Sequence, residues 1–348
     1  SLGLPPEKAT VNRMAAVLRA LGFDYVFDTS FSADLTIMEE GTEFLHRFKA
    51  GDTQFLPMFT SCCPGWVRYL KGHYPDMTAR LSTAKSPQQM FGAVARNYLS
   101  RKIGVRPDQI YSVSIMPCVA KKAECDLPTM QTEVGRDVDL ALTTRELVRM
   151  IRAEHLHPEM MAEEAFDSVL GPYSGAGVIF GATGGVMEAA LRSAYYLVNN
   201  QNPPPEAFRA VRGTADGTPG WTEAEFDLGG AVVKTAVVSG LANTRRLIEA
   251  VRAGRVHYDF VEVMACPGGC AGGGGQPHSP DDEELAQSRG QVLYSIDKGC
   301  ALRFSHENPA IQALYREALG APGSETAEAW LHTDHFGWEM PSQAGKNE

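Results

Sequence analysis

Short apolar runs alternate along the chain with segments whose apolar positions recur at helical spacing. Short apolar runs predict strands at 55–59, 111–116, 138–142 and 260–264, and the β-branched Val261 and Val263 indicate that the last is buried. A further strand is predicted at 25–28, and a hairpin within 208–238 around two adjacent glycines. Predicted helices cover 8–21, 32 onward, 86 onward, 143–151, 186–197, 243–252 and 310–319. This alternation predicts an α/β fold.

Capping signals indicate where several helices begin. The Ser32 oxygen can cap the second helix, and Ser86 followed by Gln89 predicts a capping box. Thr143 or Thr144 is expected to cap the helix that runs through residue 151. Between the elements, 154–170 predicts an acidic surface connection and 199–206 a loop. The glycine-rich stretch 175–185 lacks the order of a phosphate-binding P-loop, which favours close backbone packing.

Composition narrows the classes of protein. The 348 residues allow two domains or one large α/β unit, and 44% apolar against 21% charged residues supports a sizeable core. The net charge of -10 argues against a nucleic-acid or anionic-membrane partner. No apolar run is long enough for a membrane span, and the first residues lack the regions of a signal peptide. We expect a cytoplasmic location, or a periplasmic one through a partner or a removed signal.

The cysteines carry the candidate chemistry, because they are too few and too scattered for a disulfide scaffold. Three predicted strands, 55–59, 111–116 and 260–264, each end near a cysteine. Ligands collect at the carboxyl ends of strands in open α/β sheets, so neighbouring strands would gather four thiols. These four are Cys63, Cys118, Cys266 and Cys270. Four thiolates suit a 4Fe-4S cluster or zinc, and the lack of Cys-x2-Cys knuckles favours the cluster.

Two charged groups have an ordinary explanation from spacing alone. Glu40, Glu43 and Arg47 share one helix face, which favours a solvated stripe of ion pairs over a proton path. Lys121 and Lys122 are expected at the surface.

Three longer motifs resemble the signatures of the iron-only (FeFe) hydrogenases, in that family's order. They are TSCCPGW at 60–66, MPCVAKKAE at 116–124 and EVMACPGGCAGGGGQP at 262–277. Segments such as DTSFSADLTIMEEGTE, TTREL, FGATGGVMEAALR and AVRG resemble the same family, so the resemblance covers nearly the whole chain. It implies a two-lobed H-cluster domain, with helices flanking the sheets and the cluster in the cleft between lobes. We expect one lobe to comprise 1–125 plus the C-terminal part, and the other 126–265.

The resemblance also implies the cofactor and its ligands. The H-cluster is a 4Fe-4S cubane linked through a cysteine sulfur to a diiron subcluster with carbon monoxide, cyanide and a bridging azadithiolate. By resemblance, Cys63, Cys118, Cys266 and Cys270 hold the cubane, and Cys270 bridges to the diiron part. Lys121 would donate to a cyanide. The side chains expected to line the pocket are Gln88, Met116, Pro117, Phe180 and Met264.

The same resemblance assigns a proton path and partners. Protons would pass through Cys62, Glu40, Ser82 and Glu43, with Arg47 at the exit, which reverses the interpretation of the charged stripe. The expected activity is reversible oxidation of H2 and reduction of protons, with a ferredoxin-type acceptor or an accessory iron-sulfur domain or subunit as electron partner.

Two family features are missing from this sequence. No Cys-x2-Cys-x2-Cys run for accessory clusters is present, and neither is the Ala-Pro-x-x-Arg type segment that usually precedes the first helix. Both are expected to lie elsewhere in a longer protein or on another chain. Cys125 and Cys300 match no ligand position and are expected to be structural.

Two other functions compete with the enzyme. A hydrogen-sensing relative is expected to have lost the proton-relay cysteine, whereas Cys62 is present. A non-catalytic iron-sulfur binding or assembly protein is expected to lack the diiron pocket, whereas Lys121, Gln88 and both methionines are present.

Overall fold

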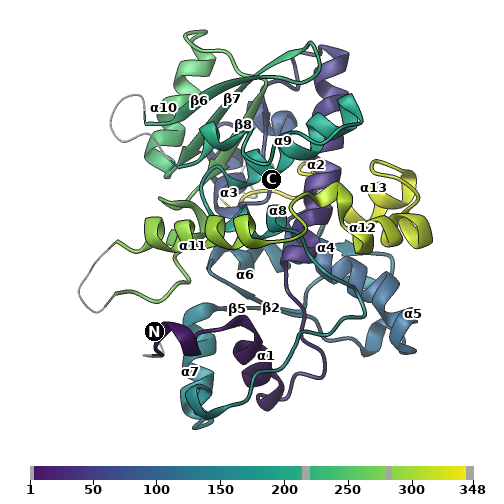
Figure 1. The fold of residues 1–348 in the computed structure, drawn as a ribbon. Helices are drawn as coiled ribbons and strands as arrows, with labels where there is room; N and C mark the ends of the chain where they lie inside the picture. The colour runs from purple at the N-terminus through teal and green to yellow at the C-terminus, as the bar shows by residue number, and fades with distance from the viewer. Residues whose placement is uncertain (1–3, 214–219, 280–283, 342–348) are drawn as a thin grey trace.

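Two sheets lie toward opposite ends of the molecule, and helices fill the space between them (Figure 1). The computed structural model describes residues 4–213, 220–279 and 284–341. The strands are β1 (Met58–Phe59), β2 (Val113–Met116), β3 (Gln131–Thr132), β4 (Gly135–Arg136), β5 (Leu140–Thr143), β6 (Thr222–Asp227), β7 (Val232–Ser239) and β8 (Phe260–Met264). The α/β class predicted from the sequence is confirmed.

The α-helices follow the sequence periodicity closely, with short 3-10 and π segments between them. They are α1 (Val11–Ala20), α2 (Ser30–Ala50), α3 (Pro64–His73), α4 (Pro87–Val94), α5 (Ser100–Ile103), α6 (Ala120–Cys125), α7 (Thr144–Ala153), α8 (Gly175–Val178), α9 (Gly185–Asn199), α10 (Leu241–Arg252), α11 (Ala286–Gly299), α12 (Pro309–Leu314) and α13 (Glu325–Leu331). Among the described helices, none is both long and apolar enough to cross a membrane.

The larger sheet has the order β1-β8-β7-β6 and carries helices on both faces. β8 runs parallel to β1 and to β7, and all five of its residues are buried. Successive side chains of a strand point to opposite faces, so Val261 packs with α3 and α10 while Phe260 packs with α2 and α9. Phe260 stacks on Phe44 of α2 with ring centroids 4.6 Å apart. Burial on both faces explains the continuous apolar run of this strand.

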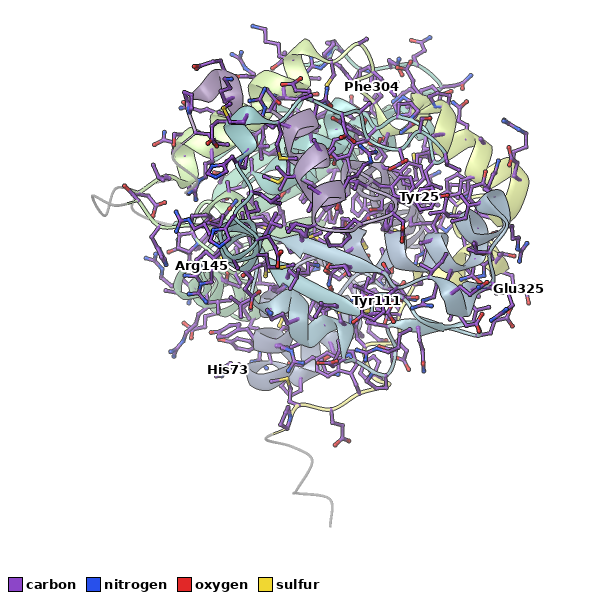
Figure 2. All side chains as sticks on the ribbon, turned by 90° about the horizontal axis from the view of Figure 1, so that it is seen from below. Tyr25, His73, Tyr111, Arg145, Phe304 and Glu325 are labelled. Carbon is purple, nitrogen blue, oxygen red and sulfur yellow. The ribbon has the colours of Figure 1, made fainter. Side chains whose placement is uncertain are left out.

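The smaller sheet pairs β2 with β5 in parallel, Val113 opposite Leu140 and Met116 opposite Thr143. Ile115 packs against Leu18 of α1 and Leu147 of α7. A groove of about 950 Å³ runs beside β2 toward the segment 22–29. Figure 2 views this face, with Tyr25 and Tyr111 labelled. The β1–β8 pair and the β2–β5 pair each join a segment before residue 125 to a segment after it. The division into two lobes at that residue stays a prediction.

Helix α2 runs between the two ends of the molecule and is buried along most of its length (Figure 1). It packs against α4, α12 and α13 through Phe31, Leu35 and Met38. Its buried Asp34 accepts hydrogen bonds from Ser174 Oγ, from Ser305 Oγ at 2.7 Å and from Asn308 Nδ2 at 2.8 Å. These bonds tie α8 and the C-terminal segment to α2.

Several predicted elements are confirmed. They include α1, β2, β5, the hairpin of β6 and β7 around Gly229 and Gly230, α9, α10 and β8. Thr143 caps α7 in a capping box with Glu146. The glycines at 175–185 pack closely, because a Cβ on Gly185 would lie 1.8 Å from the Ile179 carbonyl oxygen. Part of the predicted 208–238 hairpin, residues 214–219, lies outside the described residues.

Other predictions are wrong in detail. Residues 25–28 form no strand; Val26 instead pairs its backbone with Asp167. α2 begins two residues before Ser32, which donates to the Thr29 carbonyl. The capping box at Ser86 does not form, because Ser86 Oγ donates to Glu124 at 2.9 Å. The predicted strand at 55–59 contributes only two residues to β1, and the helix at 310–319 ends in a π-helical turn from Tyr315.

Candidate metal centre and proton path

The first two cysteines of the candidate centre lie at the ends of paired strands. β1 lines up Met58 with Phe260 and Phe59 with Val261 of β8. Cys63 follows β1 as the N-cap of α3, and Pro64 lies in the first turn of this helix, where its missing N–H has no cost. The backbone N–H of Ala265, just after β8, donates to Cys63 Sγ at 3.4 Å. The parallel pairing of the two strands therefore sets Cys63 beside the chain that leads to Cys266.

Cys118 reaches the same place from the other sheet. Gly275 N–H donates to the Pro117 carbonyl at 2.9 Å, so the glycine turn lies directly on the backbone before Cys118. A Cβ on Gly273 would lie 2.1 Å from the Pro117 oxygen, and one on Gly275 would lie 2.7 Å from Cys118 N. These two glycines are required for the close approach. The expectation that all three cysteine-bearing strands are neighbours is wrong, because β2 pairs with β5; the cysteines meet between the sheets instead.

The four thiols lie close enough to affect one another's ionisation. Burial raises the pKa of Cys270, and the charges of Cys63, Cys118 and Cys266 raise it further. Burial likewise raises the pKa of Cys63 and of Cys118. Four neighbouring, largely covered thiols are a natural place for cationic iron, which holds cysteines as thiolates.

The donors of the candidate centre are all cysteine sulfurs. Thiolates are ligands of zinc and of 4Fe-4S clusters, and a cubane takes one thiolate on each of its four irons. The donor set and the glycine turn therefore fit the cubane.

Lys121 is buried, so its predicted surface location is wrong. Its ammonium donates to the Cys62 carbonyl at 2.9 Å and to Glu124 Oε2 at 3.0 Å. Burial lowers the pKa of Lys121, but the charges of Glu124, Cys118 and Cys62 outweigh burial and raise it. A fixed ammonium thus lies beside the thiols. Lys122, by contrast, is partly exposed and pairs with Glu146.

Glu124 is a site residue that the sequence interpretation missed. It accepts from Lys121, from Gln88 Nε2 at 2.7 Å and from Ser86. The sequence feature that could have indicated Glu124 is its position three residues after Lys121 on one short helix, where the two side chains can form an ion pair. Gln88 also accepts from Ser114 Oγ at 2.6 Å, so β2, α4 and α6 hold this amide between them.

The remaining predicted pocket residues fall into two groups. Phe180 and Met264 pack with Cys62, Cys63 and Val186 in one apolar cluster. Val186 was not predicted as a pocket residue, because an apolar helix position carries no chemical signal. Met116 ends β2, and Pro117 contacts the glycine turn.

Cys62 begins a chain of polar groups that leads away from the thiols. Burial, followed by the charge of Glu40, raises the pKa of Cys62 well above its usual value, so it keeps its proton at neutral pH. Glu40 accepts from Ser61 N–H at 3.3 Å, while its Oε2 is buried without a described hydrogen-bond partner. Ser82 Oγ donates to Glu43 Oε2 at 2.6 Å.

The chain of groups ends at a cleft. Arg47 donates to Glu43, and to the Leu81 carbonyl at 3.0 Å. Arg47 also lines an open cleft of about 420 Å³. Because Glu40 is buried and Glu43 and Arg47 are mostly covered, the expectation of a solvated stripe is wrong.

Glu40 gives a pH-dependent prediction. Burial and the charge of Glu43 raise its pKa from 4.5 to about 8. Between these values the native protein holds a proton that the unfolded chain has lost, so this residue lowers stability as pH rises. Glu40→Gln removes the effect, and its stability relative to wild type should increase with pH by up to roughly 1.4 kcal/mol per unit, levelling off above about pH 8.

Denaturant unfolding at about pH 5 and about pH 8 measures this difference. Glu225→Gln, on exposed β6, is the control and should show no such growth. A Glu40→Gln difference that is the same at both pH values would contradict the raised pKa.

Comparison with known proteins agrees with this site. Residues 1–274 match the family "Iron only hydrogenase large subunit, C-terminal domain", and residues 283–338 match "Iron hydrogenase small subunit". The chain belongs to the iron-only hydrogenase family.

Particular relatives support the assignment. The chain is 48% identical over 339 residues to the NADP-reducing hydrogenase subunit HndD of Solidesulfovibrio fructosivorans, covering 96% of this chain and 57% of that protein. This chain therefore spans little more than half the length of that relative. A solved structure of a variant of the FeFe-hydrogenase HydA1 from Chlamydomonas reinhardtii superposes with a TM-score of 0.83 at 41% identity, covering 95% of this chain and 89% of that one. Cytosolic iron-sulfur assembly component 3 of Bos taurus is 33% identical over 343 residues, covering 95% and 70%.

Proposed function

We propose that this chain catalyses the reversible oxidation of H2 to protons and electrons. The observation that carries the proposal is the gathering of four partly buried thiols at a glycine turn, beside a fifth, buried thiol that leads to two mostly covered carboxyl groups. The four thiols can hold an electron-carrying cluster, and the fifth can carry protons. A hydrogenase needs both functions at one place.

The proposed cofactor is the complete H-cluster. Cys63, Cys118, Cys266 and Cys270 would hold the cubane, and Cys270 would also bind the diiron subcluster with its carbon monoxide, cyanide and azadithiolate ligands. When bound, the diiron part supplies heterolytic cleavage of H2. Lys121 would donate to a cyanide, since its ammonium is buried beside Cys62 and Glu124 holds it there.

The protein's own contribution is to carry the proton and exclude water. The Cys62 thiol stays protonated in its apolar surroundings of Met264, Val186 and Phe180, so it can give and receive a proton. Glu40, with a pKa near neutrality, accepts the proton next. Ser82 then links it to Glu43, and Arg47 holds Glu43 at the cleft.

The electron partner is proposed to be a one-electron carrier, such as a ferredoxin or an accessory iron-sulfur domain or subunit. All four proposed cubane ligands are only partly buried, whereas Cys62 is buried. Arg145 donates to the Gly274 carbonyl, and Arg289 donates to the Ala271 carbonyl at 3.2 Å. Arg145 lies at the rim of the molecule in Figure 2. These arginines place positive charge over the cubane side, which favours an acidic partner.

An assembly function is the second candidate, because an iron-sulfur assembly component is among the relatives. Such a protein needs the cubane thiols but has no use for Cys62 and its carboxyl line. A hydrogen sensor would keep the pocket and lose the proton outlet. The buried line from Glu40 to Arg47 favours the enzyme over both alternatives.

Two measurements on protein matured with the full cofactor test the proposal. We expect infrared bands of metal-bound carbon monoxide and cyanide, together with H2-dependent reduction of a viologen dye. Bands without turnover would indicate a sensor. A cubane signal with neither bands nor turnover would indicate an assembly protein.

A further inference from the structure

The proton outlet proposed above ends on a group that cannot pass a proton on. An arginine guanidinium stays charged in proteins, so Arg47 can position Glu43 but cannot accept and release its proton near neutral pH. Glu43 Oε2 faces Ser82 on the inner side. Its other oxygen, Oε1, faces Arg47 and Thr83 on the cleft side. The group that exchanges protons with solvent must therefore be found next to Oε1.

A histidine lies two hydrogen bonds away from that oxygen. Thr83 Oγ1 donates to Glu43 Oε1 at 3.2 Å and lies 2.8 Å from His332 Nδ1. His332 follows α13 and is bridged to Ala84, and Thr333 N–H donates to the Thr83 carbonyl at 2.8 Å. This antiparallel pairing holds the imidazole, the hydroxyl and the carboxylate in line.

The other ring nitrogen of His332 is fixed by a buried carboxylate. His332 Nε2 lies 3.0 Å from Glu39 Oε2, and Glu39 also accepts from Tyr315 OH and from Gly323 N–H at 2.9 Å. Because a carboxylate only accepts, the contact with Glu39 keeps a proton on Nε2, so Nδ1 is the nitrogen that gains and loses one. The Thr83 hydroxyl lies within hydrogen-bond distance of both Glu43 Oε1 and Nδ1, so it can donate to either group and accept from a protonated Nδ1.

His332 lies at the cleft where the outlet ends, although its own side chain is only 5% exposed. It lines the 420 Å³ cleft together with Arg47, Glu328, Asp334 and His335. Glu328 Oε2 lies 3.7 Å from Nδ1, and its side chain is 55% exposed.

Burial lowers the pKa of His332, but the hydrogen bond and charge of Glu39, with the charges of Glu43 and Glu328, outweigh burial and raise it. The neighbouring His335 differs, because burial lowers its pKa and its Nε2 donates to the Ser82 carbonyl at 2.7 Å.

We propose that His332 is the residue that exchanges protons between solvent and the relay, through the Thr83 hydroxyl to Glu43. For outward transfer, protonated Glu43 gives its proton to Thr83 Oγ1 while the Thr83 hydroxyl gives its own to neutral His332 Nδ1. The carboxyl O–H and the hydroxyl O–H break, a new hydroxyl O–H and an Nδ1–H form, and one positive charge moves to the ring. The imidazolium then releases its proton to water or Glu328 in the cleft, and the inward direction reverses each step.

The proposal rests on the relay from Cys62 to Glu43, and the test separates the two. In fully matured enzyme, His332→Ala should lower H2-dependent viologen reduction about 10²-fold in weak buffer. Added imidazole, which the cleft can admit, should restore most of the rate. Thr83→Val should lose a similar share of activity without rescue by imidazole, because the hydroxyl that links the cleft to Glu43 is gone.

Thr333→Val is the matched control. It loses a hydroxyl contact of 2.9 Å to Thr129 beside the same cleft and should leave the rate unchanged. A readout independent of turnover is the infrared band of the protonated Glu40 carboxyl, whose pKa burial raises to about 8, identified by its loss in Glu40→Gln. After a pH jump this band should equilibrate more slowly in His332→Ala than in wild type.

The His332 proposal would be overturned if His332→Ala showed full turnover and unchanged equilibration of the band. If Cys62→Ser were inactive in the same experiments, the proposed relay would still be supported. An active Cys62→Ser would overturn the relay itself.

Discussion

Cys62→Ser is expected to keep the complete cofactor and lose at least about 99% of the hydrogenase activity, since a positioned proton-transfer group contributes roughly 10²-fold or more. The serine hydroxyl fits the space of the thiol but is a far weaker acid. In the apolar surroundings of Met264 and Phe180 it cannot give its proton to Glu40. None of the proposed cubane ligands is changed, so cofactor binding should survive.

Infrared bands and viologen reduction measured on the same sample provide the check. Cys300→Ser is the control, because Cys300 lies outside the thiol group and should tolerate the change with full activity. Wild-type turnover in Cys62→Ser would show that protons leave by another route.

Cys270→Ser is expected to abolish retention of the diiron subcluster. Cys270 lies in the turn Gly269–Gly272, where the charges of Cys63, Cys118 and Cys266 add to the effect of burial in raising the pKa of its thiol. A serine oxygen is a poor bridge between two soft iron centres, and no second protein sulfur is proposed to hold the diiron part. The carbon monoxide and cyanide bands should therefore disappear after maturation.

Comparison with Cys266→Ser isolates the bridging function. Cys266 belongs to the same strand end and the same thiol group, but it is proposed to bind the cubane alone. Bands that persist in Cys270→Ser would disprove the bridge. Bands lost in Cys270→Ser and weakened but present in Cys266→Ser would support it.

The two buried glutamates of α2, Glu39 and Glu40, have different surroundings. Glu39 and Glu40 are consecutive residues, so they point to different sides of the helix. Glu40 faces the thiols, whereas Glu39 faces Tyr315 and His332 near the C-terminal segment. In the proposed relay, one helix would thus carry a proton-accepting group on one side and the support of the exchange residue on the other.

Several local features of the fold follow from short stretches of the sequence. Proline after Cys63, the threonine cap of α7, the apolar run of β8 and the run of glycines predicted a cysteine at a strand end, a helix start, a buried strand and a close backbone approach. Each of these depends on neighbouring residues only, which is why the sequence was sufficient.

The three-dimensional packing decided the rest. Helical periodicity predicted that Glu40, Glu43 and Arg47 share a face, but burial depends on what covers that face, and the covering residues come from distant segments such as 81–84 and 331–335. Lys121 is buried because Cys62 and Glu124 provide partners for its charge, which its own sequence context cannot reveal. His332 lies 249 residues from Thr83, and only the antiparallel contact of their segments brings the imidazole to the proton path.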